Sequence, residues 1–373
     1  MNNAMFKFPL LALAASLLAA CGGGEPSAPG ETAASAADAT AAAPAAIDCP
    51  AEAGLTYVCG PQGAEDLLSL GLTGRILASG MSGQNTPGHM YLVDPVSLQF
   101  RELVHTDAFS QVPDTTRFPS CPGPLNLQAF SVHGLSVHET APGVFEVYTT
   151  SHGEREAIEV YELDTDFNNG GAAPTLAWKG CVVLPANTFA NSVARLSDGG
   201  FVTTKMMDPA QGFASVQSGA ITGVVYEWHP GGEVTAIEGT ELAGANGIAV
   251  SDDERYMYVA TIGGREVVKF DRSTTPIGKQ VVNLDIAPDN IRWAGPGKLL
   301  TAGNNYVDPA TCSGPNCATG WSVLEVDAET LAVTRIGGAD QNVALQGVSS
   351  ALRVDGNIWV GSFNDDRIGY FTP

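Results

Sequence analysis

The chain has 373 residues, 44 % of them hydrophobic, which is enough to bury one large core or two ordinary ones. Its formal net charge of −22 would repel a phosphate backbone, so it excludes nucleic acid as a partner and suits a protein that binds cations. With 43 glycines and 23 prolines, the composition favours many short strands and turns over a bundle of helices.

The first twenty residues have the pattern of a signal peptide. Lys7 precedes an uncharged apolar run at 8–20 that is shorter than the ~20 residues needed to span a bilayer. The run ends in LLAAC at 17–21, which resembles the bacterial lipobox and implies cleavage before Cys21 and attachment of lipid to its sulfur. The alternative is an ordinary cleaved signal peptide with an incidental cysteine.

The lipobox implies a place in the cell and a domain layout. We expect a protein of the bacterial cell envelope, anchored by lipid in the outer membrane and facing the periplasm or the surface. Residues 21–46 would be the lipidated cysteine and a flexible tether, because this Gly-, Ala-, Pro-, Ser- and Thr-rich stretch has almost no large apolar side chain. The folded domain is then expected at 47–373, as a monomer whose only membrane contact is the lipid.

Six cysteines follow Cys21, and an even number outside the cytoplasm predicts disulfides. They are Cys49, Cys59, Cys121, Cys181, Cys312 and Cys317. Nearness in sequence favours Cys49 with Cys59 and Cys312 with Cys317, which leaves Cys121 with Cys181. The alternative is a zinc site, which no Cys-x-x-Cys pair or matching histidine cluster supports.

One pattern recurs six times in the rest of the chain: a polar residue, an alternating apolar run, a polar or glycine-rich turn, and a second apolar strand. The repeats start at Glu65, His133, Asn191, Asn246, Asp289 and Gln346. Such repeats predict an all-β protein, a six-bladed β-propeller whose four-stranded sheets surround a central channel. A pair of β-sandwiches is the alternative, but it would not explain why the polar residue keeps the same phase.

The phase of the repeats predicts a metal site in the channel. The innermost strands of a propeller run along its axis, so the six starting residues should form a ring that faces one point. Carboxylate and amide oxygens are hard ligands that suit calcium, and magnesium or manganese as well. The alternative is that the amides cap strand ends by bonding to backbone groups.

Two histidines would lie beside this ring. His133 starts the second repeat, and His152 ends the next strand of the same repeat, where it can fold back toward His133. Because the pKa of histidine lies near neutrality, the pair could serve as a general base. The alternative is one packed histidine and one solvated histidine.

Several short motifs together resemble the paraoxonase/arylesterase family, within the broader group of gluconolactonase- and strictosidine synthase-like six-bladed propellers. They occur in that family's order and at similar spacing, from about Gly60 to the end of the chain. The motifs are AEDLL at 64–68, HGLSV at 133–137, the histidine of SHGE at 151–154, ANGIAVS at 245–251, PDNI at 288–291 and LQGVSS at 345–350.

This resemblance implies a calcium-dependent hydrolase of small-molecule lactones and esters. By the matching motifs, the catalytic calcium would be held by Glu65, Asn191, Asn246, Asp289 and Asn290. His133 would activate water and His152 would assist it. The calcium would polarise the substrate carbonyl and stabilise the oxyanion.

The sequence departs from the family at a second, structural calcium. Asp66 and the carbonyl of Leu135 fit that site, but Ser192 stands where the family has an aspartate, which argues against a second ion. The family's hydrophobic N-terminal anchor is also replaced here by the lipobox and tether.

Two other functions fit the same sequence. One is a sugar lactonase of the gluconolactonase type, in which a divalent metal and an acid do the chemistry and the histidines are incidental. The other is a binding or scaffold propeller without catalysis, whose metal is structural, because the propeller fold hosts many functions.

Overall fold

The structure, a computed structural model, describes residues 49–83, 86–165, 173–306, 320–340 and 345–373. By its internal contacts the chain divides into Met1–Ala45 and Ala46–Pro373, and all described residues belong to the second unit. The expected signal peptide, Cys21 and tether, and the expected pair Cys312 and Cys317, lie outside the described residues. No helix within the described ranges is long and apolar enough to cross a membrane.

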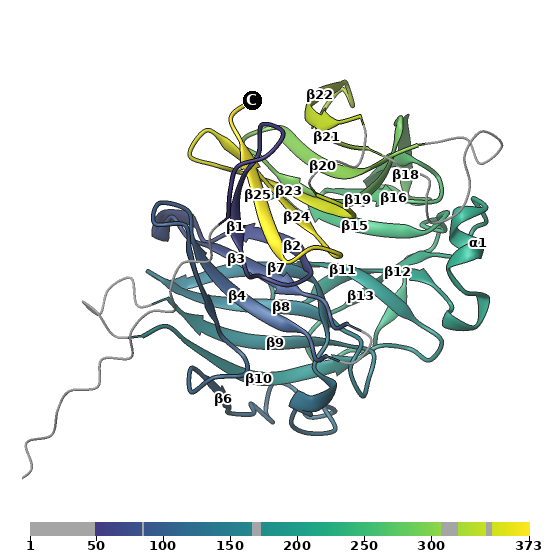
Figure 1. Cartoon of the computed structure of the whole chain (residues 1–373). Helices are drawn as coiled ribbons and strands as arrows, with labels where there is room; N and C mark the ends of the chain where they lie inside the picture. The colour runs from purple at the N-terminus through teal and green to yellow at the C-terminus, as the bar shows by residue number, and fades with distance from the viewer. Residues whose placement is uncertain (1–48, 84–85, 166–172, 307–319, 341–344) are drawn as a thin grey trace, which may run out of the picture. The chain divides into compact units, whose positions relative to one another are not determined.

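Six sheets follow one another along the chain, and the first, third, fourth and fifth of them begin with their innermost strand (Figure 1). The first three are β2–β5 (Ala64–Ser69, Ile76–Gly80, His89–Asp94, Gln99–Glu102), β7–β10 (Val132–Ala141, Val144–Ser151, Ala157–Asp164, Thr175–Val183) with β6 (Phe109–Gln111) at the outer edge, and β11–β14 (Phe189–Arg195, Phe201–Met207, Val224–Trp228, Thr235–Ala236).

The last three sheets complete the set. They are β15–β18 (Ala245–Val250, Tyr256–Thr261, Glu266–Asp271, Gly278–Asn283), β19–β22 (Ile286–Trp293, Lys298–Asn305, Trp321–Asp327, Val333–Ala339), and β23–β25 (Val348–Val354, Asn357–Ser362, Arg367–Phe371) with β1 (Thr56–Cys59) at the outer edge. Helical segments in the described ranges are short: α1 (Phe213–Gln217) and three 3-10 turns at Gly71–Thr73, Leu127–Ala129 and Pro209–Gln211.

The six first strands form a closed ring. In chain order β2, β7, β11, β15, β19 and β23 each pack on the next, and β23 packs on β2. The N-terminal strand closes the circle, because β1 pairs antiparallel with β25 of the last sheet (Figure 1). The all-β six-bladed propeller expected from the repeats is therefore confirmed.

The core lies between neighbouring blades, so most inner strands are covered on both faces. One cluster joins Tyr258 and Val267 of the fourth blade to Ile286 and Leu299 of the fifth. A strand buried on both faces has a continuous apolar run instead of strict alternation. Tyr256–Thr261, for example, is buried from Met257 to its end.

Two of the three expected disulfides are confirmed. Cys49 bonds to Cys59, which ends β1, and Cys121 bonds to Cys181 in β10. The first bond ties the start of the folded unit to the strand that closes the propeller.

Candidate metal centre

The ring residues lie at one recurring irregularity, a β-bulge near the start of each innermost strand. The pairing of β2 with β3 shifts register between Ala64 and Asp66, and comparable shifts contain His133, Asn191, Asn246, the pair Asp289–Asn290 and Ser349. A bulge re-aims a side chain that would otherwise point into a sheet face, and bulges are frequent next to functional sites. Each of the six bulges therefore places at least one polar residue in the ring of inner strands.

Glycine follows the bulged residue at two places where neighbouring inner strands leave no room for a side chain. A Cβ on Gly247 would lie 2.5 Å from the Ile291 nitrogen, and one on Gly134 would lie 2.5 Å from the Ser192 Cα. Both distances are below any contact that a side chain can make. The pairs Asn246–Gly247 and His133–Gly134 thus combine a polar residue at the bulge with close packing of the inner strands.

Five side chains of this ring each carry a buried oxygen atom that has no hydrogen-bond partner among the described residues. The atoms are Glu65 Oε2, Asn191 Oδ1, Asn246 Oδ1, Asp289 Oδ1 and Asn290 Oδ1. Buried polar atoms are normally paired, and leaving one unpaired costs about 1–3 kcal/mol. All five residues are those that the sequence motifs assigned to a calcium ion.

The hydrogen bonds that the amide nitrogens make explain why the amide oxygens have no partner. The Nδ2 of Asn290 donates to Glu65 Oε1 at 2.6 Å, and the Nδ2 of Asn191 lies 3.2 Å from His133 Nε2. The amide nitrogens are therefore used within the ring, and the amide oxygens are left for another group. An oxygen-only donor set of this kind suits a hard cation such as calcium.

Burial makes the two acids of the ring unfavourable as bare anions. Burial, and then repulsion by Asp66, raises the pKa of Glu65 well above its ordinary value. Burial, and then repulsion by Glu65, raises the pKa of Asp289 in the same direction, while His133 and a hydrogen bond from Asn246 oppose it. A bound cation would remove this penalty.

Within the described part of the chain, no three His, Cys, Asp or Glu side chains form a metal-binding group by themselves. Any metal held here would depend on the amide oxygens of Asn191, Asn246 and Asn290 as much as on the two carboxylates. The residues present fit a calcium ion and fit zinc poorly, since zinc prefers nitrogen and sulfur.

The two histidines meet as the sequence predicts. The Nδ1 of His133 lies 2.8 Å from the Nε2 of His152, and His133 Nε2 lies 3.4 Å from Glu65 Oε1. Burial lowers the pKa of His133, against the opposing effect of Asp289, Asp66 and Glu156. His133 is therefore a neutral imidazole next to the bare oxygens, which is the form that a base requires.

The sixth expected ring residue, Gln346, is not in the ring. It is exposed, lies before β23, and its backbone nitrogen donates to Asp365 Oδ2 at 2.6 Å. The bulge position of that blade is held by Ser349, whose hydroxyl donates to the backbone oxygen of Glu65 at 2.6 Å. The sixth blade therefore contacts the backbone of Glu65 through Ser349.

The two groups expected at a second calcium bind an arginine. Arg292 forms a two-pronged ion pair with Asp66, with Nε 3.1 Å from Oδ1, and its Nη2 donates to the carbonyl of Leu135 at 2.9 Å. A guanidinium thus already neutralises the carboxylate and satisfies the carbonyl. We do not assign a metal to Asp66 and Leu135, in agreement with the argument from Ser192.

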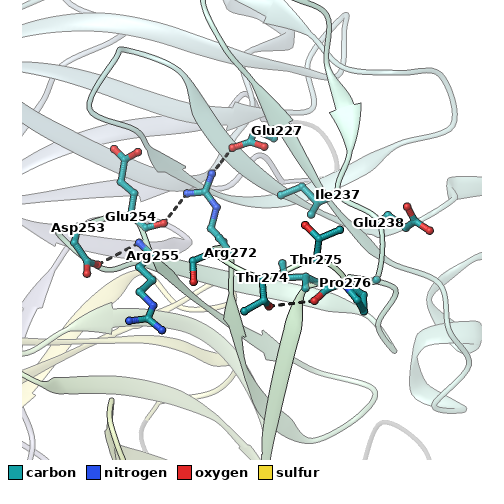
Figure 2. Close-up of a pocket in the computed structure, with 13 residues that line it drawn as sticks. Glu227, Ile237, Glu238, Asp253, Glu254, Arg255, Arg272, Thr274, Thr275 and Pro276 are labelled. Atoms are coloured by element: carbon teal, nitrogen blue, oxygen red, sulfur yellow. Dashed lines mark hydrogen bonds and ion pairs between the residues drawn. The ribbon is translucent and has the colours of Figure 1, made fainter.

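A separate surface groove of about 890 Å³ lies between the outer parts of the third and fourth blades (Figure 2). Arg272 pairs there with Glu227 and donates to the carbonyl of Glu254 at 3.1 Å. The Arg255 backbone nitrogen donates to Asp253 Oδ1, also at 3.1 Å. These charged groups satisfy one another, and none of the expected site residues lines the groove.

Comparison with known proteins supports the broader of the two resemblances. Residues 153–314 match the family model described as SMP-30/gluconolactonase/LRE-like region, a range that contains the third and fourth blades and parts of the second and fifth. A search of curated protein sequences found no match. The narrower likeness to paraoxonases stays a prediction.

Solved structures share the fold at low sequence identity. A luciferin-regenerating enzyme is 16 % identical, with 85 % of this chain and 93 % of that chain covered and a TM-score of 0.53. A gluconolactonase from Xanthomonas campestris is 14 % identical, with 86 % and 89 % covered and a TM-score of 0.51. At these identities the likeness establishes the propeller fold and leaves the chemistry to the site itself.

Proposed function

We propose that this protein is a calcium-dependent hydrolase of lactones or esters. The observation that carries the proposal is the set of five unpaired buried oxygens with the Nε2 of His133 beside them. A bound cation would satisfy the unpaired buried oxygens, and the neutral imidazole of His133 beside them would supply the base that hydrolysis needs. The match to a gluconolactonase-like family model agrees with lactone chemistry.

Calcium, when bound, would polarise the carbonyl of the substrate and stabilise the oxyanion that develops on it. Glu65, Asp289 and the three asparagines would hold the ion. The Nε2 of His133 would take a proton from a water molecule beside the substrate carbonyl. The contact between its Nδ1 and the Nε2 of His152, at 2.8 Å, would hold the ring in place while Nε2 takes that proton.

The first test is turnover of a panel of lactones and phenyl acetate by the purified protein, with calcium and then with a chelator. Hydrolysis that is lost on chelation and restored by calcium is the expected result. A melting temperature that falls on chelation without any turnover would show instead that the ion only holds the propeller together, and the hydrolase proposal would fail.

A sugar lactonase in which the histidines are incidental is the second candidate, favoured by the family match at 153–314. Replacement of His133 by glutamine separates the two. If His133 is the base, kcat should fall by about 10²-fold or more while calcium still raises the melting temperature. If activity survives, the metal and an acid do the chemistry. His105→Gln is the matched control, because His105 bonds to the Gly88 carbonyl and lies outside the ring.

A further inference from the structure

The histidine pair continues into a carboxylate that no sequence motif marked. The Nδ1 of His152 lies 3.0 Å from both Oε1 and Oε2 of Glu156. The hydrogen-bonded series therefore runs from Glu156 through His152 to His133. The exposed fraction of the side chains falls along it, from 20 % for Glu156 to 11 % for His152 and 7 % for His133.

The chemistry of each partner fixes the position of every proton in this series. When Glu156 is a carboxylate and the His152 ring is neutral, the carboxylate can only accept, so the Nδ1 of His152 carries the proton and its Nε2 is bare. The Nδ1 of His133 then donates to that bare nitrogen, which leaves the Nε2 of His133 bare as well. The Nδ2 of Asn191, a donor 3.2 Å from that nitrogen, agrees with this arrangement. Glu65 Oε1 lies farther from it, at 3.4 Å, and accepts a hydrogen bond from Asn290.

Three consecutive residues of β11 hold the three members in place. Phe189 stacks on the His152 ring with centroids 4.3 Å apart and planes within 3°. The Ala190 nitrogen donates to Glu156 Oε1 at 2.5 Å, and Asn191 contacts His133. The carboxylate of Glu156 is thus tied to the strand that also carries a candidate metal ligand.

We infer that Glu156 is a positioning residue for the proposed hydrolysis, because its carboxylate fixes the tautomer of His152 and through it the direction of the His133 lone pair. The catalytic part of this inference rests on the proposed function. The tautomers themselves are a property of the protein alone and can be measured without substrate or metal.

Nitrogen-15 NMR of the full chain, labelled in its histidine rings and kept in chelator at neutral pH, reads the tautomers directly. Both His133 and His152 should carry the proton on Nδ1 and have a bare Nε2, with signals assigned from His133→Gln and His152→Gln spectra. A proton on Nε2 of His133 in the wild-type protein would overturn the inference.

Glu156→Gln is the informative variant. Glutamine keeps the size of the side chain and an oxygen for the Ala190 N–H, but its amide can donate to His152 Nδ1 as readily as its carbonyl can accept. The single tautomer of His152 and His133 should become a mixture. The control is Glu154→Gln on the same loop, because Glu154 bonds to Asn126 instead, at 2.6 Å.

Lactone kinetics then test the consequence for catalysis. A carboxylate that orients a catalytic histidine directly is worth about 10⁴ in kcat, and one that acts through a further group is worth about 10–100-fold. Glu156→Gln should lower kcat by about 10–100-fold with little change in KM, and Glu154→Gln should not. A lower melting temperature with unchanged tautomers and kcat would reduce Glu156 to a structural residue.

The two proposals fail in different ways. Wild-type protein that hydrolyses no substrate but shows both Nδ1-protonated histidines, lost in Glu156→Gln, refutes the hydrolase and leaves the positioning intact. Active wild-type protein whose tautomers and kcat are the same in Glu156→Gln refutes the positioning and leaves the hydrolase intact.

Discussion

Replacing Arg292 by methionine is expected to lower the free energy of unfolding by about 3–5 kcal/mol, the usual cost of removing one partner of a buried ion pair. Asp66 is fully buried, and without the guanidinium its carboxylate would keep only the backbone N–H groups of Leu67 and Leu135. Two neutral donors do not balance a charge at that depth. Denaturation in urea measures the loss.

The position of Arg292 in the ring of inner strands should increase the loss of stability. Arg292 belongs to β19, which is adjacent in the ring to β15 and β23, yet its side chain bonds to Asp66 of β2 and Leu135 of β7. One side chain therefore links three blades across the channel. We expect its loss to weaken the closure of the propeller as well as the local pair.

Two comparisons separate this explanation from a general effect of losing an arginine. Arg255→Met breaks the exposed pair with Asp271, at 2.9 Å, and should cost less than about 1 kcal/mol. The double variant Asp66→Asn with Arg292→Met removes both charges and should be more stable than Arg292→Met alone. If Arg292→Met cost no more than Arg255→Met, or if the double variant were the least stable, the charge of Arg292 would not be what stabilises the buried Asp66.

The ring could be predicted from sequence because it repeats. Asn246 is a polar residue at the start of an otherwise apolar strand, and a core gives it no reason to be there. The same anomaly at Glu65, Asn191 and Asp289, in one phase, turned four weak signals into a single site. A periodic pattern does not depend on side-chain contacts, so it can be recognised from the sequence alone.

Gln346 shows where this reasoning fails. The sequence Gln346–Gly347 resembles Asn246–Gly247, so the local pattern predicts Gln346 as the ring residue of the sixth blade. The bulge in β23 falls at Ser349 instead, because its register is set by pairing with Ser362 and Gly361 of β24. Strand register depends on contacts with the neighbouring strand, which a local pattern does not contain.

Arg292 and Glu156 were missed for a related reason. The partner of Arg292 lies 226 positions away along the chain, so spacing could not join them. One signal was present: a charged residue inside an apolar inner strand must have a buried partner. Glu156 had no such signal, since an acid in a turn is ordinary until His152 is seen to face it.

Asp289→Asn is expected to remove calcium-dependent activity and also to make the metal-free protein more stable at neutral pH. Asp289 and Glu65 have pKa values raised well above the ordinary range by burial and, for Asp289, by repulsion from Glu65. In the unfolded chain these groups release their protons near pH 4. The folded protein therefore binds more protons than the unfolded chain above about pH 4, and its free energy of unfolding falls as the pH rises through the folded pKa values.

Asparagine removes one of the two acids and the repulsion between them, so the variant in chelator should lose less stability between about pH 5 and pH 8 than the wild type. Calcium should reverse the wild-type loss, with a binding affinity that increases with pH because the ion competes with protons for the carboxylates. Calcium at about 100 times its Kd would add about 2.7 kcal/mol to the wild type and nothing to the variant.

Melting temperatures at both pH values, in chelator and in calcium, test the stability arm, and lactone turnover tests the catalytic arm. Asp285→Asn is the matched control, because Asp285 is exposed just before the same strand. The variant at 289 should lose activity by about 10²–10³-fold, the usual effect of losing one electrostatic stabiliser of the transition state. Two results would show that the bare oxygens do not form a cation site. One is that calcium still raises the melting temperature of Asp289→Asn. The other is that the metal-free variant is less stable than the wild type at the higher pH.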